Sequence, residues 1–407
     1  MLSLIPEMLL IAGIILLVSV ILSKLSSHAG IPVLLVFLVL GMFMGSEGPV
    51  GIYFDNYTYV QYICVFALTI ILFSGGLDTD IKEAKPIAKS GIALGTIGVL
   101  ITAITTGLFI HFILGFDLIA SLLIGSIISS TDVSAVISIF RTNKLKLKHR
   151  LEHLIEFESA VNDPMANILT LSFVHLMLHP KTSIFEIILS LIQALVIGTI
   201  FGFISGKLSV KFINKINLET KGLYPVILIA IALLSFSVSE IVGGSGFLAV
   251  YISSLLIGNS AIVSKKAMVS FFDGLAWLMQ IIMFIILGLV VFPSELIPSA
   301  LTSLIIAVGL ILIARPLAVY LCMLPSNYNF KEKLFISWTG IKGAVPIVFA
   351  TYPLVAGIKN SLFIFNIVFF ITIISILLQG STIKILAKKL KLIQETDPGE
   401  FLFKKND

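Results

Sequence analysis

Two acidic residues in apolar surroundings, Asp132 and Asp163, are the residues of this sequence best suited to chemistry. A charged side chain at the centre of a membrane-spanning helix costs about 2.5–3.5 kcal/mol, so each one needs a functional or structural reason. A carboxylate in a narrow, partly wetted cavity holds either a proton or a small cation, and it gains little from holding both. We therefore expect a proton and a cation to compete for Asp163, which directly follows Asn162.

Oxygen atoms near these carboxylates indicate a cation site. Thr131 precedes Asp132, and Ser159 lies four residues before Asp163, on the same face of a helix. Hydroxyl and carboxylate oxygens are hard ligands, which suit alkali cations. We expect Asp163, Asp132, Thr131 and Ser159 to bind K⁺ or Na⁺ as transported ions, and we expect no other cofactor. The alternative is that these side chains only hold helices together.

Two further charged residues, Glu158 and Lys342, are expected to support the site. Glu158 lies five residues before Asp163, so the two side chains diverge by roughly 140° on a helix. If two broken helices cross near the site, Asp132 and Lys342 would neutralise the partial charges of the half-helix ends. A pair between Lys342 and Glu158 is the alternative. Arg315 lies nearer to a predicted helix end and is expected to reach water.

The elements that position these residues must be membrane-spanning helices. Of the 407 residues, 58% are hydrophobic and 12% are charged, and the mean hydropathy is +1.11. Soluble domains are only about 45–50% apolar. A span needs roughly 20 mainly apolar residues. This rule predicts about thirteen spans, at residues 7–25, 31–45, 58–77, 87–114, 118–140, 153–178, 183–206, 222–241, 245–259, 270–292, 297–323, 333–356 and 361–386. We expect one all-α transmembrane domain over residues 1–387 and a short cytoplasmic tail over residues 388–407.

Basic residues predict the orientation, because Lys and Arg accumulate in short cytoplasmic loops. The even-numbered loops hold only Lys181 and Lys359. The odd-numbered loops hold Lys24, Lys82, Lys85, Lys89, Arg141, Lys144, Lys146, Lys148, Arg150, Lys207, Lys211, Lys215, Lys221, Lys265, Lys266, Lys331 and Lys333. The alternation predicts a multi-pass protein of the plasma membrane with its N-terminus outside and its C-terminus in the cytoplasm. It also explains the basic pI without a nucleic-acid partner.

The thirteen spans divide into six, one connector and six, which inverts the second half relative to the first. Spans five and twelve then correspond, and both have polar or helix-breaking residues at their middle. These residues are Ser126, Ser129, Ser130, Thr131, Asp132 and Ser134 in span five, and Gly340, Gly343, Pro346 and Pro353 in span twelve. We expect two inverted six-helix repeats with discontinuous helices in spans five and twelve, the pattern that marks a transport site in many secondary transporters.

Three segments carry a resemblance to a known family. They are Ser129-Ser130-Thr131-Asp132, Phe157-Glu158-Ser159-Ala160-Val161-Asn162-Asp163-Pro164-Met165-Ala166, and Trp338-Thr339-Gly340-Ile341-Lys342-Gly343-Ala344-Val345-Pro346-Ile347-Val348. In order and spacing they resemble the NhaP-type monovalent cation:proton antiporters of the sodium/proton exchanger fold, most closely the potassium/proton subgroup. The resemblance covers nearly the whole chain.

The resemblance implies a homodimer in the cell membrane, in which a six-helix core moves against a dimerisation domain by alternating access. Asp163 would carry cation and proton in turn, with Thr131, Ser159 and Asp132 around the ion. The Asn162-Asp163 pair, in place of two aspartates, is similar to the electroneutral branch, which exchanges one cation for one proton. Such exchange would serve ion transport and pH homeostasis.

The resemblance also implies supporting roles, and the sequence departs from the family in places. Asn162 would hold Glu158, and Lys342 would take the place of the family's usual arginine opposite Glu158. Lysine lacks the planar fork that binds a carboxylate through two parallel bonds. Ser74 stands where the family usually has an acid before Gly75 and Gly76. Potassium/proton members often carry a cytoplasmic regulatory domain, whereas this sequence ends in a short tail.

Other classes of function fit the residues less well. A sodium-coupled symporter of organic anions on the same fold would need a roomy basic site, and only Lys342 offers a central cation. An intramembrane aspartyl protease would use Asp132 and Asp163 as a dyad, but neither aspartate lies in the Gly-x-Gly-Asp type of context. No repeat typical of a channel filter is visible. We therefore expect a transporter and not an enzyme.

Overall fold

The structure is a computed structural model that describes residues 4–29, 32–132, 136, 140 and 146–394. In these residues the secondary structure is helical, apart from an isolated antiparallel bridge between Leu147 and Ile393. Ser134, Arg141, Lys144 and the tail from residue 395 onward, all of which entered the predictions above, lie outside the described residues.

The helices follow one another along the chain with short connections. The first half holds α1 (Leu4–Ala29), α2 (Val33–Met44), α3 (Tyr57–Asp78), α4 (Ile81–Ala84), α5 (Ala88–Ala93), η1 (Leu94–Gly98), α6 (Val99–Leu114), α7 (Leu118–Ile127), η2 (Lys148–Arg150), α9 (Leu151–Leu178) and α10 (Ile184–Ile216). The second half holds α11 (Leu223–Ile241), α12 (Gly246–Gly258), α13 (Lys265–Leu289), α14 (Pro293–Leu296), η3 (Ile297–Ser299), α15 (Ala300–Gly309), η4 (Leu310–Ala314), α16 (Arg315–Cys322), α17 (Phe330–Trp338), α18 (Ala344–Val355), α19 (Ser361–Ser375), η5 (Ile376–Gly380) and α20 (Ser381–Lys389).

The chain is an all-helical, multi-pass membrane protein. In the described ranges, eight helices or continuous helix series are long and apolar enough to cross a membrane. The shorter apolar helices are α2, α7, α12 and α18. Helix α9 has the length of a span but carries the polar segment around Asp163. Each predicted span overlaps at least one helix in the described residues, although span five is helical there mainly over Leu118–Ile127 and span twelve is divided between α17 and α18. The exact number of spans and their inverted repeat stay predictions.

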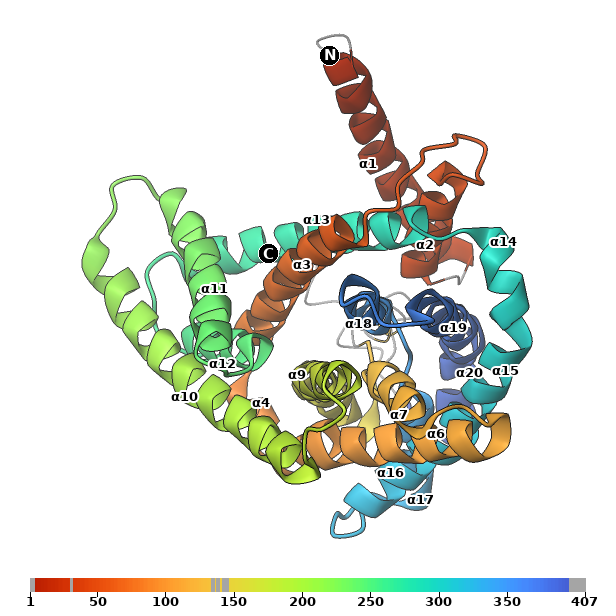
Figure 1. The fold of residues 1–407 in the computed structure, drawn as a ribbon. Helices are drawn as coiled ribbons and strands as arrows, with labels where there is room; N and C mark the ends of the chain where they lie inside the picture. Colours follow the sequence, from red (N-terminus) through yellow and green to blue (C-terminus); the bar gives the residue numbers. More distant parts are fainter. Residues whose placement is uncertain (1–3, 30–31, 133–135, 137–139, 141–145, 395–407) are drawn as a thin grey trace.

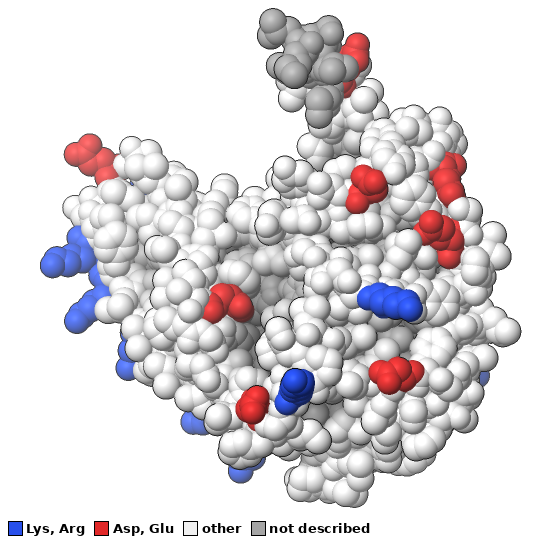
Figure 2. Space-filling view, in the orientation of Figure 1, with Lys and Arg blue, Asp and Glu red and all other residues white. Residues whose placement is uncertain are grey.

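Figure 1 shows how the helices surround the polar segments. Helices α7, α9 and α18 lie in the middle, with α6, α15 and α19 beside them. Helices α3 and α13 pack together along one side, and α10, α11 and α12 form a group that packs against α3. Helix α1 projects from the rest of the molecule. On the face shown in Figure 2, charged side chains are few and scattered over a mostly uncharged surface.

Two helices of the central group are interrupted at their polar positions. Helix α7 begins at an Asp117 cap, which accepts hydrogen bonds from the amides of the first turn, and ends at Ile127. Helix α17 ends at Trp338, and α18 resumes at Ala344 after a non-helical segment. The two irregular segments meet, because the Asp132 amide donates to the Ile341 carbonyl at 2.8 Å. This contact replaces hydrogen bonds that the broken helices lack.

Three of the long helices contain a π-helical turn, at η1, η4 and η5. A π turn inserts one extra residue and changes the direction in which the following side chains point, and it is frequent at functional sites. Segment η4 ends directly before Arg315, and η1 packs against α9 and α16. One π turn therefore contacts α9 directly, and a second directly precedes Arg315.

Candidate ion-binding site

A cavity of about 170 Å³ reaches the polar segments from one face of the molecule. One wall belongs to α9, which contributes Glu156, Ser159 and Asp163, and Asp132 from the irregular segment after α7 joins them. The opposite wall belongs to α3 and α13. The structure thus brings together both carboxylates that the sequence singled out.

Asp163 lies at the buried end of this cavity, with 7% of its surface exposed. The Ser130 hydroxyl donates to Asp163 Oδ1 at 2.5 Å. Helix α9 continues through Pro164, so the carboxylate projects from a continuous helix toward an irregular one. A single short hydrogen bond fixes one carboxylate oxygen and leaves bonding capacity for an ion on the other.

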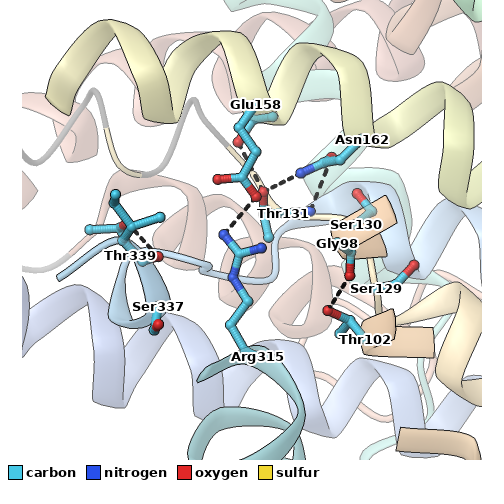
Figure 3. Close-up of polar contacts among 12 residues, drawn as sticks. Gly98, Thr102, Ser129, Ser130, Thr131, Glu158, Asn162, Arg315, Ser337 and Thr339 are labelled. Carbon is cyan, nitrogen blue, oxygen red and sulfur yellow. Dashed lines mark hydrogen bonds and ion pairs between the residues drawn. The ribbon is translucent and has the colours of Figure 1, made fainter. Parts of the chain in front are cut away.

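Ser159 lines the same cavity as Asp163, and its hydroxyl contacts Thr131, which does not line the cavity. Thr131 Oγ1 and Ser159 Oγ are 2.9 Å apart. The Asn162 amide donates to Thr131 Oγ1 at 2.5 Å and accepts from the Thr131 backbone amide at 3.3 Å, as Figure 3 shows. The expectation that Asn162 holds Glu158 is therefore wrong. Asn162 instead fastens the irregular segment of α7 to α9, because both of its side-chain groups bind Thr131.

Glu158 forms an ion pair with Arg315, and not with Lys342 as we expected. Arg315 Nη2 lies 2.6 Å from Glu158 Oε1, and the two residues are 3% and 1% exposed. Figure 3 shows the guanidinium reaching from α16 toward α9. The expectation that Arg315 reaches water near a helix end is therefore wrong, because its side chain is buried. A π turn directly precedes Arg315, and a Cβ on Gly340 would lie 2.6 Å from Arg315 Nε, so a larger residue at position 340 would displace the guanidinium.

Lys342 is buried at the end of the interrupted helix α7. Its ammonium donates to the carbonyls of Ser129 at 3.2 Å and Ser130 at 2.9 Å. The carbonyls at the end of a helix carry partial negative charge, which an ammonium neutralises. This geometry matches the expectation that Lys342 neutralises the end of a half-helix. Its own backbone amide donates to Ser375 Oγ at 2.8 Å, which ties the break in α17–α18 to α19.

Asp132 lies in the matching position at the start of α18. A Cβ added to Gly343, which caps that helix, would lie 1.7 Å from Asp132 Oδ2. The carboxylate therefore occupies the space that a larger residue would fill, next to the positive end of the α18 dipole. Asp132 and Lys342 thus each lie at the end of a half-helix from the other broken span.

Ser130 and Arg315 contribute to the site although neither was predicted as a site residue. Ser130 was visible only as one member of a polar run, and its contact with Asp163 depends on how the irregular segment folds. Arg315 had a stronger signal, because an arginine inside the apolar stretch 297–323 needs a buried partner unless it reaches water. Spacing alone does not identify a partner 157 residues away.

Two broken helices that cross beside a buried carboxylate, at the end of a cavity with acidic walls, define a secondary transporter for ions.

The family model described as sodium/hydrogen exchanger, transmembrane, matches residues 13–389. The K(+)/H(+) antiporter NhaP of Alkalimonas amylolytica is 39% identical over 383 residues, which are 94% of this chain and 67% of the relative. The K(+)/H(+) antiporter NhaP2 of Shewanella oneidensis is 37% identical over 386 residues, again 94% and 67%. The chain belongs to the sodium/hydrogen exchanger family.

A solved structure has the same fold. The sodium proton antiporter MjNhaP1 from Methanocaldococcus jannaschii, at pH 8, superposes with a TM-score of 0.82 at 24% identity and covers 93% of this chain and 97% of that one. This chain spans about two thirds of the length of the curated relatives named above. The predicted family resemblance is confirmed by these comparisons.

Proposed function

We propose that this chain is a secondary active antiporter that exchanges one monovalent cation, K⁺ or Na⁺, for one proton, with both ions competing for Asp163. The observation that carries the proposal is the balance of buried charge around the cavity. Three carboxyl groups, Asp132, Glu158 and Asp163, lie with two cationic groups, Arg315 and Lys342, in the buried interior. With all five ionised the net charge is −1, because Arg315 pairs with Glu158 and Lys342 balances one aspartate.

A buried excess charge is costly, and the site lowers this cost by taking up one positive charge. Either a proton or a monovalent cation on Asp163 brings the buried set to neutrality. The two loaded states then have the same charge, which is the condition for exchange that moves no net charge. The Asn at position 162, where a second aspartate would add another negative charge, supports the same conclusion.

The relatives support cation/proton exchange and leave the cation open between two ions. The NhaP relatives are named as K(+)/H(+) antiporters, and the structural neighbour MjNhaP1 is a sodium proton antiporter. The ligands offered here, carboxylate and hydroxyl oxygens, suit either alkali ion. Among the described residues, the lining of the cavity contains five acidic side chains and no Lys or Arg, which disfavours an organic anion as substrate.

We further propose that the cavity opens to the cytoplasm. Asp78 lies at its mouth, and the loop that follows carries Lys82 and Lys85, which the distribution of basic residues places inside the cell. The remaining parts of the proposal are two inverted six-helix repeats, alternating access, a homodimer in the plasma membrane, and a cytoplasmic tail after residue 387. The interrupted helices α7 and α17–α18 and the match in fold support them.

The proposal is tested in proteoliposomes that hold the purified full chain and a pH-sensitive dye. K⁺, Na⁺ and Li⁺ are added in turn, and the initial rate of proton movement is compared at several imposed membrane voltages. We expect exchange with K⁺ or Na⁺ at a rate independent of voltage, because the two loaded states carry equal charge. A rate that follows voltage would contradict one-for-one exchange, and cation addition without proton movement would contradict antiport.

A further inference from the structure

Gln280 is a buried polar residue in the cavity that the proposed mechanism does not use. It belongs to α13, is 9% exposed and lines the same cavity as Asp132 and Asp163. Its Oε1 is shielded from solvent and has no hydrogen-bond partner among the described residues. A buried amide oxygen without a partner costs free energy, so the position calls for a ligand that supplies the missing contact.

The spacing of residues places Gln280 at the depth of Asp163. On α13, Asp273 is exposed and Gln280, seven residues later, is buried; on α9, Glu156 is half-buried and Asp163, also seven residues later, is buried. Seven helical residues rise about 10 Å. All four residues line the cavity, so the two helices run in the same direction from its acidic mouth to its buried end. Gln280 therefore belongs to the α3–α13 wall at the level of the carboxylate.

The side chains that the α3–α13 wall presents to the cavity change from acidic at the mouth to neutral at the buried end. Its acidic residues, Asp78 and Asp273, are exposed at the mouth, whereas the buried polar residues that it offers to the cavity are Ser74 and Gln280. Ser74 stands where the family resemblance implies an acid. A neutral wall opposite Asp163 keeps the buried charge at −1, and it can still supply oxygen ligands.

We propose that Gln280 is a cation ligand on the wall opposite Asp163, where its amide oxygen replaces part of the hydration shell and favours K⁺ over Li⁺. This inference rests on the proposed exchange of alkali cations. An amide oxygen is a neutral ligand of modest field strength. Such oxygens replace the water of a weakly hydrated ion such as K⁺ more readily than that of a small, strongly hydrated ion.

The test compares the wild type with Gln280→Leu, Gln280→Asn and the control Met283→Leu in proteoliposomes. Met283 lines the same cavity one turn away, and Met→Leu conserves volume. For Gln280→Leu we expect the KM for K⁺ to rise about tenfold, the change that 1.4 kcal/mol produces. The KM for Li⁺ should rise much less. Gln280→Asn keeps the oxygen on a shorter arm and should lie between Gln280→Leu and the wild type, while Met283→Leu should match the wild type.

An unchanged ratio of the KM values for K⁺ and Li⁺ in Gln280→Leu would overturn the inference, whether or not the maximal rate falls. A second measurement separates this failure from failure of the proposed function. Cation binding raises the melting temperature of purified protein in detergent, without any exchange. At equal K⁺ concentration, the melting temperature of the wild type should rise more than that of Gln280→Leu. Absence of exchange by the wild type contradicts the proposed function, whereas equal stabilisation of both proteins contradicts the role of Gln280.

Discussion

At the scale of single residues, the site depends on hydrogen bonds between an irregular segment and a regular helix. Ser130 donates to Asp163, and Asn162 holds Thr131. The carboxylate is thus positioned by a helix, while several of its oxygen neighbours are positioned by backbone that is not helical. Removal of one donor should weaken ion binding without unfolding the protein.

Ser130→Ala should raise the apparent KM for the transported cation about tenfold, because the ionised carboxylate loses a donor and a hydrogen bond to a charged group contributes about 1.5–3 kcal/mol. Ser129→Ala is the matched control, since the Ser129 hydroxyl donates to the Ser126 carbonyl. Initial rates over a range of cation concentrations give the result. Equal KM values for the two variants would contradict a role of Ser130 at Asp163.

Glu158 and Arg315 should behave as one unit in a double-mutant cycle. Loss of one partner of a buried ion pair costs about 3–5 kcal/mol, because the other charge is left uncompensated. Glu158→Gln and Arg315→Met should therefore each lower the melting temperature in detergent strongly. The double variant should be more stable than the sum of the two effects predicts. Strict additivity would show that the pair contributes no coupling.

The residues that form the site could largely be predicted from the sequence, but the contact partners of Glu158 and Asn162 could not. Burial of Asp163 and Asp132 followed from apolar flanks, and the position of Ser159 on the same cavity wall as Asp163 followed from helical spacing. The partner of Glu158 did not, because Arg315 is distant in sequence and points inward only after a π turn. Asn162 was assigned to Glu158, four residues away on its helix, whereas its contacts cross to another segment.

At the scale of elements, two glycines in the break of α17–α18 make room for charged side chains. Gly340 leaves space for Arg315, and Gly343 leaves space for Asp132. The sequence predicted an interruption here from glycine and proline content, and it predicted the polar interruption of span five. The crossing contact between Asp132 and Ile341 depends on tertiary structure, which periodicity does not report.

Gly343→Ala should abolish exchange, because the added Cβ would overlap the Asp132 carboxylate and force it or the break in α17–α18 to move. Gly274→Ala on α13 is the matched control, since a Cβ at that position meets no atom within 4 Å. Proton movement on cation addition measures the outcome, and expression in the membrane shows that both variants fold. Exchange by Gly343→Ala at the wild-type rate would contradict the close packing of Asp132 at the start of α18.

At the scale of the whole molecule, the segment after α20 is fixed to the loop before α9. The Lys148 amide donates to the Leu392 carbonyl at 2.9 Å, and the Gln394 amide donates to the Lys146 carbonyl at 2.8 Å. Leu392 is buried in the core. The C-terminal end of the described chain therefore stabilises the entry to the helix that carries Asp163.

Leu392→Ala should destabilise the protein by about 2–5 kcal/mol, the usual cost of removing a buried leucine side chain. Ile385→Ala on α20 is the control, because that side chain is 54% exposed and its loss leaves no cavity in the core. Thermal unfolding in detergent compares the two. Similar melting temperatures for both variants would contradict docking of this segment on the loop before α9.

The fold class and the approximate positions of the helices followed from hydropathy, because the apolar stretches contain helices wherever the structure describes the chain. The short helices α2 and α12 were found for the same reason. The π turns were not predicted, since they change the register of a helix by one residue without changing its composition. The three-dimensional grouping of α10, α11 and α12 apart from the centre also lies beyond what composition reports.

The most direct test of the account is cation/proton exchange by Asp163→Asn in inside-out membrane vesicles, with Asp273→Asn at the mouth of the cavity as the matched control. Asparagine keeps the volume of the side chain but holds neither a proton nor an ionic charge. We predict that Asp163→Asn shows no proton movement with K⁺, Na⁺ or Li⁺, although it is present in the membrane. Asp273→Asn should retain exchange at saturating cation concentration. Wild-type exchange by Asp163→Asn would contradict the competition of cation and proton for this carboxylate.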